Sequence, residues 1–457
     1  MVKKIGLAVG ALFIGCFLFL FSVAWMQEDH LLIGEEFGTM GEILELKHKV
    51  ESCFESLESR HHREVNSILS HYLFIDLSKN NRLVCHGKAN EVRADRKVLA
   101  QVLKDLYQQR DHIRLVVCDV LLKDSMDYTW MSQCAKTTND SGIDSANYEA
   151  AAIDSSLSAA LDSFQVLAKL VVPAEYDDSS SQMIPLCFKR LTYGVAQYQK
   201  VFNASFYRYH YLVNDSVRSL PMVMYDMLDN NGHATRCETP QSIGTLSGNH
   251  SPHGAVSLNT ITPYFRVTHD DLYDGISYYT ASSFDSNLII HRDSLIVIIG
   301  SYEGGDVHNT LIGQMTGPLI LVNLYESLKH HDNDLEWWFI LLTLIAYSYI
   351  GWLTLIKWYG KAGKVHDVPK KGAVKITIGD KELKILSSVV TVIRDIIYYL
   401  ICHIKHLLCE HGNHFILLMW IVISLVKFHH YLYLLSALIE LILLELIIGL
   451  VRYCYRR

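Results

Sequence analysis

Two long apolar runs, one near each end of a 300-residue polar stretch, set the organisation of this chain. Ile5–Trp25 contains no charge and follows Lys3 and Lys4, and Trp337–Ile356 is the second run. Each is long enough to cross a bilayer as a helix. A removable signal peptide is the alternative for the first run, but no small-x-small cleavage site follows it. Because lysines favour the cytoplasmic side, residues 1–4 are predicted there and the segment between the runs outside it.

Short apolar runs alternate with amphipathic segments between these two spans. The pattern predicts strands at Phe74–Leu77, Leu115–Leu122, Phe164–Val172 and Leu295–Ile299, and helices at Arg93–Tyr107, Asp154–Leu161, Leu220–Leu228 and Leu319–Leu328. Residues 124–148 are polar and predict a loop, and 177–286 predict a loop-rich insertion. Strands that alternate with helices indicate an α/β domain with a mixed or parallel sheet flanked by helices.

A helix with apolar residues three and four apart is predicted before this domain, within 26–70. A stalk that packs on its own domain is the preferred interpretation. A coiled coil that would make the protein a homodimer is the alternative, but the pattern covers only two heptads.

The chain after the second span remains largely apolar. Residues 358–384 form a lysine-rich loop, which fits the cytoplasmic side. Residues 385–410 carry a polar stripe along one helix face, which favours a helix lying in the membrane interface; a true span with a polar face is the alternative. Either 385–408 or 407–428 crosses the membrane, and the last span within 411–452 returns. About three transmembrane helices are therefore expected after the soluble domain, with 453–457 as a cytoplasmic tail.

Charge and cysteine usage narrow the function classes. The net charge of −7 lacks the basic excess typical of nucleic-acid binding, so no nucleic-acid partner is expected. Six of the ten cysteines lie between the two spans, where disulfides are permitted, although the sequence does not select a pairing. Cys118 lies in a predicted strand and is interpreted equally well as a small buried apolar residue.

Three aspartates end or follow predicted strands, which makes them candidate ligand-binding residues. Asp76, Asp119 and Asp306 would meet at the carboxyl edge of a parallel sheet, where open α/β sheets bind ligands, and Arg96 begins a helix near the same edge. The competing interpretation is that these carboxylates only cap turns and helices. No catalytic motif occurs, so an enzyme is not expected. No metal site or cofactor is assigned.

The ordered motifs resemble the CHASE2 domain, an extracytoplasmic sensory module of bacteria. The resemblance runs over about residues 26–450 and is carried by a strand ending in Asp76, the helix start Asp95–Ala100, the strand Val116–Leu122 and a closing run from Val297 to Leu328. In that closing run an apolar strand ends at Gly300 and is followed by Asp306, Thr310 and Thr316-Gly317. A proline expected after Thr310 is absent, as is a tryptophan ahead of the arginine helix.

The resemblance implies a CHASE2-like sensory domain over 71–335, with span 5–25 before it and span 336–357 after it. It also implies that Asp306 and Thr310 belong to the ligand-binding loop. The expected protein is a multi-pass protein of the bacterial inner membrane with its main domain in the periplasm. It would bind an unknown small molecule and, because no effector domain follows the last span, pass a signal to a separate membrane or cytoplasmic partner. The alternative function is a non-sensing scaffold or accessory subunit of a membrane complex.

Overall fold

The computed structural model divides the chain into two compact units, which are described separately. We call Leu31–Leu335 the α/β unit, and Met1–His30 together with Glu336–Arg457 the helical unit. The structure describes residues 2–27, 63–86, 89–122, 141–177, 182–183, 188, 190–196, 199–201, 205–213, 217–230, 232, 249–250, 256–257, 260–261, 264–274, 277–310, 312–332, 334, 336–361, 419–420 and 422–423.

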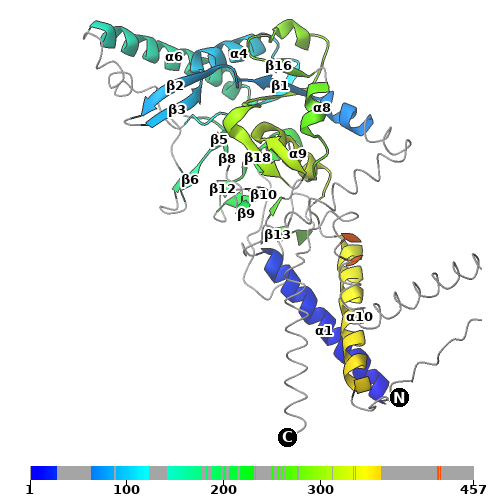
Figure 1. Ribbon diagram of the computed structural model, residues 1–457. Helices are drawn as coiled ribbons and strands as arrows, with labels where there is room; N and C mark the ends of the chain where they lie inside the picture. The colour runs from blue at the N-terminus through cyan, green and yellow to red at the C-terminus, as the bar shows by residue number, and fades with distance from the viewer. Residues whose placement is uncertain are drawn as a thin grey trace, which may run out of the picture. The chain divides into compact units, whose positions relative to one another are not determined.

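The α/β unit is built on a six-stranded sheet in which every neighbouring pair is parallel (Figure 1). Its strands, in spatial order, are β16 (Tyr278–Thr280), β1 (Tyr72–Asp76), β17 (Leu295–Gly300), β4 (Ile113–Cys118), β5 (Leu170–Ala174) and β8 (Tyr193–Val195). β17 has the burial of a central strand, since all six of its residues are buried. The predicted parallel sheet is therefore confirmed, with β17 between β1 and β4.

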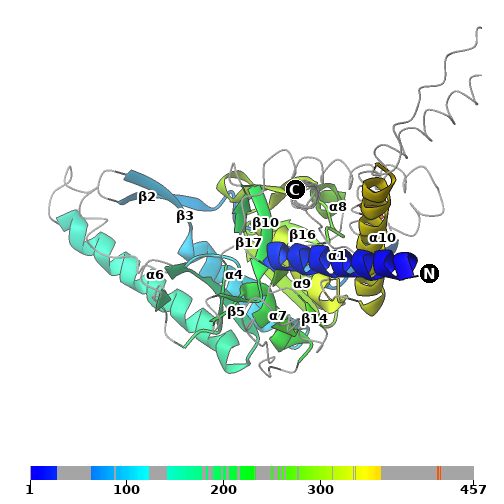
Figure 2. The ribbon, with the colours of Figure 1, turned by 90° about the horizontal axis from the view of Figure 1, so that it is seen from below.

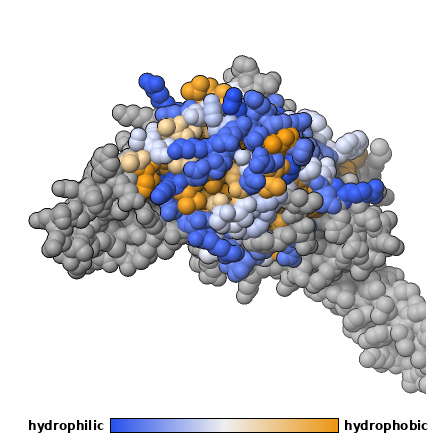
Figure 3. All heavy atoms as spheres, turned by 90° about the horizontal axis from the view of Figure 1, so that it is seen from above, coloured by the Kyte–Doolittle hydropathy of each residue, from blue (hydrophilic) through white to orange (hydrophobic). Residues whose placement is uncertain are grey.

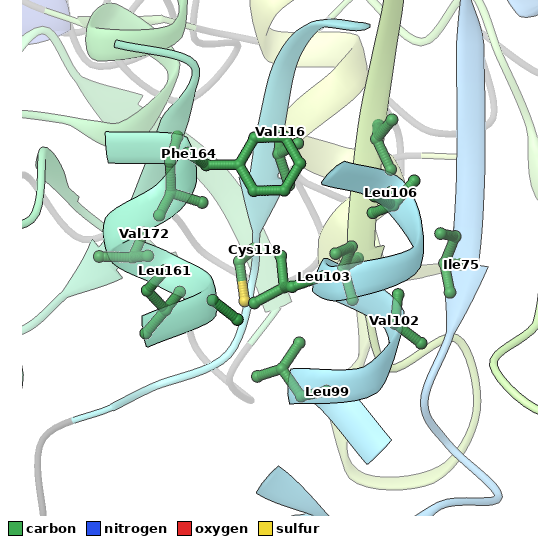
Figure 4. Packing of buried hydrophobic residues seen from close by; sticks show 14 of the residues in the cluster. Ile75, Leu99, Val102, Leu103, Leu106, Val116, Cys118, Leu161, Phe164 and Val172 are labelled. Carbon is green, nitrogen blue, oxygen red and sulfur yellow. The ribbon is translucent and has the colours of Figure 1, made fainter. Parts of the chain in front are cut away.

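Two helices, α4 (Arg96–Gln108) and α6 (Ser141–Val166), cover one face of the sheet. Figure 4 shows Leu99, Leu103 and Leu106 of α4 converging with Leu161 and Phe164 of α6 on side chains from β1, β4 and β5. The start of α4 is fixed by Asp95, whose carboxylate accepts a hydrogen bond from the backbone nitrogen of Lys97 at 2.9 Å. Such an N-cap satisfies one of the free amides of the first turn.

Helices α7 (Leu220–Leu228) and α9 (Gly317–Lys329) pack together on the opposite side of the sheet. Both carry proline in the first turn, where the missing amide costs nothing. Every residue of α9 from Pro318 to Leu328 is buried. Its polar side chains are satisfied by a neighbouring segment: Asn323 exchanges two hydrogen bonds with the backbone of Val267, and the Ser327 hydroxyl accepts one from the amide of Tyr264.

The remaining elements are short. They are β2 (Asn81–His86), β3 (Ala89–Ala94), β6 (Tyr176–Asp177), β7 (Gln182–Met183), β9 (Gln199–Val201), β10 (Ser205–His210), β11 (Leu212–Val213), β12 (Val217–Arg218), β13 (Asn249–His250), β14 (Val256–Ser257), β15 (Thr260–Ile261), α8 (His269–Asp274), η2 (Ser286–Ile289), η3 (Gly304–Asp306), β18 (Val307–Thr310) and β19 (Gly313–Thr316). β9, β10 and β15 form a small antiparallel sheet, whose central strand β10 is labelled in Figure 2. The face of the α/β unit in Figure 3 is mainly hydrophilic, with small separate apolar patches.

Two boundaries predicted from sequence are wrong. Residues 141–148, assigned to a polar loop, are helical and belong to α6, as do Phe164 and Val166, assigned to a strand. The polar residues misled the prediction, although alanines at 146 and 150–152 favour helix. Phe164 projects from α6 into the apolar core and is fully buried there, together with side chains of the neighbouring strands.

The helical unit contains α1 (Val2–Gln27) and α10 (Trp337–Lys361), which pack against each other. Within the described residues, Trp337–Ile356 is the single helix long and apolar enough to cross a membrane, and Ile5–Leu20 is a shorter apolar helical stretch. The heptad pattern before residue 63, the loop after 361, the 385–410 helix and most of 411–457 lie outside the described residues.

Candidate functional site

The carboxyl edge of the sheet brings two of the predicted aspartates to either side of Gly300. Asp76 ends β1 and pairs in register with Gly300, the last residue of β17. Asp119 follows β4, and its backbone amide donates to the carbonyl of Ile299 at 2.7 Å. Because all three strands run in the same direction, their ends meet at one edge, as the sequence predicted.

Helix α9 begins directly against this edge. A side chain at Gly300 would place its Cβ 2.5 Å from Cγ of Pro318 and 3.4 Å from Cβ of Asp119. A Cβ at Gly317 would lie 2.6 Å and 2.8 Å from the two carboxylate oxygens of Asp306. Glycine at both positions therefore allows the helix start, Asp119 and Asp306 to approach closely. A carboxylate at a helix N-terminus is favoured by the helix dipole, which explains the position of Asp306.

Asp119 occupies an unfavourable environment for a carboxylate. Its side chain is partly buried, and it receives no hydrogen bond from any residue that the structure describes. Burial, and secondarily the charge of Asp306, raise the pKa of Asp119 well above its ordinary value. A carboxylic acid kept in this position without compensating donors is typical of functional sites, although structural clusters can produce the same shift.

Asp76, in contrast, is fully engaged in structure. Oδ1 accepts from the backbone amide of Ser78 at 2.7 Å, from its hydroxyl, and from the amide of Tyr302 at 3.2 Å. Oδ2 accepts from the hydroxyl of Tyr278 at 2.6 Å. The carboxylate thus joins the ends of β1, β16 and β17, which is the turn-capping role that the sequence analysis weighed against ligand binding.

Arg96 is placed in a helix–helix contact. It is the first residue of α4, and its guanidinium donates to Asp154 of α6 at 2.8 Å. The group also lies over the ring of Phe188, 5.7 Å from the centroid. Arg96 is 8% exposed, so most of its surface serves this contact.

Thr310 lies at the turn of the β18–β19 hairpin. Its hydroxyl donates to the carbonyl of Gly313 at 2.8 Å and accepts from the amide of Ile312 at 3.3 Å. Thr310 lies four positions after Asp306, at the end of β18, which corresponds to about 13 Å at roughly 3.3 Å per residue. The structure therefore assigns Thr310 to the hairpin turn and does not bring it to Asp306.

Two further residues lie at the carboxyl edge of the sheet, and the sequence predicted a binding role for neither, His308 having been interpreted as a loop residue. His308 lies in β18, two residues after Asp306, which ends η3, and its Nε2 is 3.1 Å from Oδ1 of Asp306. Tyr302 is completely buried, and burial, followed by the charges of Asp119 and Asp76, raises the pKa of its phenol.

Among the described residues, no group of three or more histidine, cysteine, aspartate or glutamate side chains is arranged to hold a metal ion. Cys118 is fully buried as a free thiol, and burial raises its pKa to about 12, so it serves as a small core residue. Comparison of the chain with protein-family models, curated proteins and solved structures finds no match.

Proposed function

We propose that this protein is a membrane-anchored extracytoplasmic sensor that binds a small polar ligand at the carboxyl edge of its parallel sheet. The position of Asp119 carries the proposal. A partly buried carboxylate beside Asp306, without a hydrogen-bond donor among the described residues, destabilises the unliganded fold, and a ligand that supplies donors or positive charge would relieve this penalty.

Chain connectivity supports a signalling role for the same edge. Asp306 contacts the first residue of α9, and only seven residues separate the end of α9 at Lys329 from the start of α10 at Trp337. A ligand that moved Asp306 would act on the start of a buried helix, whose other end leads into the candidate membrane span. The proposed position of the α/β unit is the periplasm of a bacterial cell, with the multi-pass topology and the separate signalling partner that the CHASE2-like motifs imply.

Thermal unfolding of the full chain in lipid nanodiscs tests ligand binding. The panel would contain amines, polyols, amino acids and mono- and divalent cations. A ligand present at about 100 times its Kd raises the free energy of unfolding by about 2.7 kcal/mol, which shifts the midpoint visibly. The sensor hypothesis predicts that at least one solute shifts the midpoint, and that Asp119→Asn and Asp306→Asn each abolish that shift.

Asp162→Asn is the matched control, because Asp162 is an exposed carboxylate on α6. This variant should keep the ligand-induced shift in full. A shift that survives both edge variants would place the ligand elsewhere, and a panel without any effect on the folded protein would contradict the sensor proposal.

A scaffold function is the second candidate, and one contact in the helical unit favours it. The ring of Trp420 stacks on Phe339 of α10, with centroids 6.1 Å apart and planes 18° apart. Trp420 therefore packs on α10, which is a contact that a multi-helix membrane assembly would use. Purification from native membranes separates the two candidates: a scaffold recovers a stoichiometric partner whether or not solutes are present.

A further inference from the structure

The exposed surface of α1 and α10 is apolar, unlike that of a water-soluble helix pair. On α1 the exposed side chains are large and apolar, with Phe13 76% exposed and Val9 62% exposed. On α10 the exposed residues are likewise apolar, among them Leu341, Ile345 and Tyr349. The buried face of α10 carries Thr343 and Thr354 beside the larger Phe339, Tyr347 and Ile350. Large apolar side chains on the outside of a helix pair, with some polar residues inside, are typical of helices surrounded by lipid.

Two hydroxyls on the buried face, those of Thr343 and Thr354, are satisfied in the way that a bilayer requires, whereas Oγ of Ser348 is buried without a hydrogen-bond partner among the described residues. The hydroxyl of Thr343 donates to the carbonyl of Phe339 at 2.7 Å, and that of Thr354 donates to the carbonyl of Ile350 at 2.8 Å. Because both bonds stay inside the helix, neither hydroxyl needs water. Trp337 and Trp338 are both exposed at the start of α10, where an aromatic belt would meet the membrane surface.

Glycines make the closest approach between the two helices. A Cβ on Gly15 would lie 2.2 Å from Oγ of Ser348 and 2.7 Å from its backbone nitrogen, so no larger residue fits without moving α10. From the other helix, a Cβ on Gly351 would lie 3.1 Å from the carbonyl oxygen of Ala11 and 3.1 Å from Cβ of Ile14. Small residues at such a crossing let two membrane helices gain close backbone packing, which replaces the hydrophobic effect inside lipid.

We propose that α1 and α10 form one helix pair inside the bilayer, crossing at Gly15 and Ser348, and that α1 stays in the mature protein as the partner of α10. A secretory leader is removed and needs no complementary surface on a later helix. The two-sided fit of Gly15 and Gly351 gives α1 such a surface. This inference concerns the membrane anchor and does not depend on ligand binding by the α/β unit.

Disulfide trapping in membranes tests the crossing in the full chain. Ile14→Cys and Gly351→Cys are combined in a background where all ten native cysteines are replaced, the buried Cys118 by alanine and the other nine by serine. The 3.1 Å separation of the two Cβ positions is within a few tenths of an ångström of the roughly 3.5–4.5 Å seen in disulfides. A specific protease site inserted between residues 124 and 140 allows the chain to be cut between the two helices after oxidation, and the fragments are resolved under denaturing, non-reducing conditions. The proposal expects the two fragments to remain joined until a reductant is added.

A second cysteine pair controls for random collision. Phe13→Cys with Gly351→Cys uses the neighbouring residue of α1, which faces away from α10. These fragments should separate after proteolysis under the same oxidation. Equal cross-linking of both pairs would show that α1 has no fixed face toward α10 and would overturn the proposal.

Two glycine substitutions test the close contact itself. Gly15→Leu should abolish cross-linking of the Ile14→Cys and Gly351→Cys pair, whereas Gly6→Leu should leave it unchanged because nothing lies within 4 Å of a Cβ at Gly6. Intact mass of the purified chain supplies an independent measurement, and residues 1–25 should be retained. A mature protein that begins after Trp25 would overturn the proposal, as would cross-linking that survives Gly15→Leu.

Discussion

The hydroxyl of Tyr72 donates a 2.6 Å hydrogen bond to Oε1 of Glu326, joining the first residue of β1 to the last turn of α9. Glu326 is only 1% exposed, and its carboxylate also lies 3.3 Å from Nζ of Lys329 and 3.4 Å from Nε2 of His330. Burial alone raises the pKa of Glu326, but the bonds from His330 and Tyr72 and the charge of Lys329 outweigh burial and hold the pKa below its ordinary value. The contact therefore stabilises the fold as a charged network.

Replacing this carboxylate should weaken the fold at neutral pH. Glu326→Gln is expected to lower the free energy of unfolding by about 1.5–3 kcal/mol, the usual contribution of hydrogen bonds to a charged group. Because the folded pKa is depressed, the stabilisation exists above the unfolded pKa of about 4.3 and disappears as pH falls through the folded value. Denaturant unfolding at pH 7 and at pH 3 measures both effects.

Glu303→Gln is the control for this substitution, because Glu303 is an exposed carboxylate whose nearest cation, Lys79, is 4.0 Å away. It should change the free energy of unfolding by less than about 0.5 kcal/mol. A difference between wild type and Glu326→Gln that did not shrink at pH 3 would contradict the charged-network explanation.

Asp119→Asn should have the opposite effect and stabilise the protein. The raised pKa of Asp119 means that the folded state favours the protonated form, so the favourable contribution exists below the unfolded pKa of about 3.9 and is lost as pH rises through the folded pKa. The amide carries no charge to desolvate and should add roughly 1–3 kcal/mol at pH 7, with little difference at pH 3. Unfolding midpoints across this pH range measure the gain, and a destabilised variant would show that Asp119 has a donor in the folded protein.

The Arg266–Asp332 ion pair provides a test of coupling between the segment before α8 and the end of α9. The guanidinium donates two hydrogen bonds to the carboxylate, one of them 2.7 Å long, and both residues are buried. Asp332→Leu should lower the free energy of unfolding by about 1.5–3 kcal/mol because it removes both hydrogen bonds from the buried guanidinium and leaves Glu64, 3.5 Å from Nε, as its remaining anionic partner. Arg266→Met with Asp332→Leu should restore much of that loss, and strictly additive effects in the double-mutant cycle would contradict the pairing.

The close packing of the start of α9 against Gly300 can be tested by introducing a steric clash and then removing it with a second substitution. Gly300→Ala should lower the free energy of unfolding by about 1–3 kcal/mol because its Cβ would lie 2.5 Å from Cγ of Pro318. Pro318→Ala removes that atom, so Gly300→Ala should cost much less stability in the Pro318→Ala background than in the wild-type protein. An equal loss of stability in both backgrounds would show that Gly300→Ala acts through the backbone of residue 300 and not through the contact with Pro318.

The local pattern of apolar residues was sufficient to predict a strand or a helix where the segment shows a clear run or period of apolar residues. The all-apolar run Leu295–Ile299 predicted a strand buried on both faces, and the proline-led segment Leu220–Leu228 predicted a helix with its observed bounds. Sequence reasoning failed at 141–148, where polar residues in a helix resemble a loop until the helix finds its packing partner. It also gave no sign of the β2–β3 hairpin, whose register depends on pairing rather than on composition.

The candidate site was predicted only in part for a similar reason. Strand ends can be read from sequence, so the gathering of Asp76 and Asp119 around Gly300 was foreseeable. The hydrogen-bond partners of each carboxylate could not be predicted, because they come from distant segments of the chain. Tyr278, for example, lies two hundred residues after Asp76. Only those contacts separate Asp76, which has donors, from Asp119, which has none among the described residues.

The order of the strands also bears on how this domain is made. β1 and β4 are synthesised early, yet each pairs with β17 rather than with the other, and β17 ends at Gly300. Until the ribosome has passed that residue, the two early strands lack the neighbour that joins them. Such long-range pairing slows folding and leaves apolar strand edges open to aggregation. A chain anchored early through α1 would therefore hold an unfinished sheet outside the membrane for most of its translation, which makes this domain a strong candidate client for chaperones that guard nascent chains.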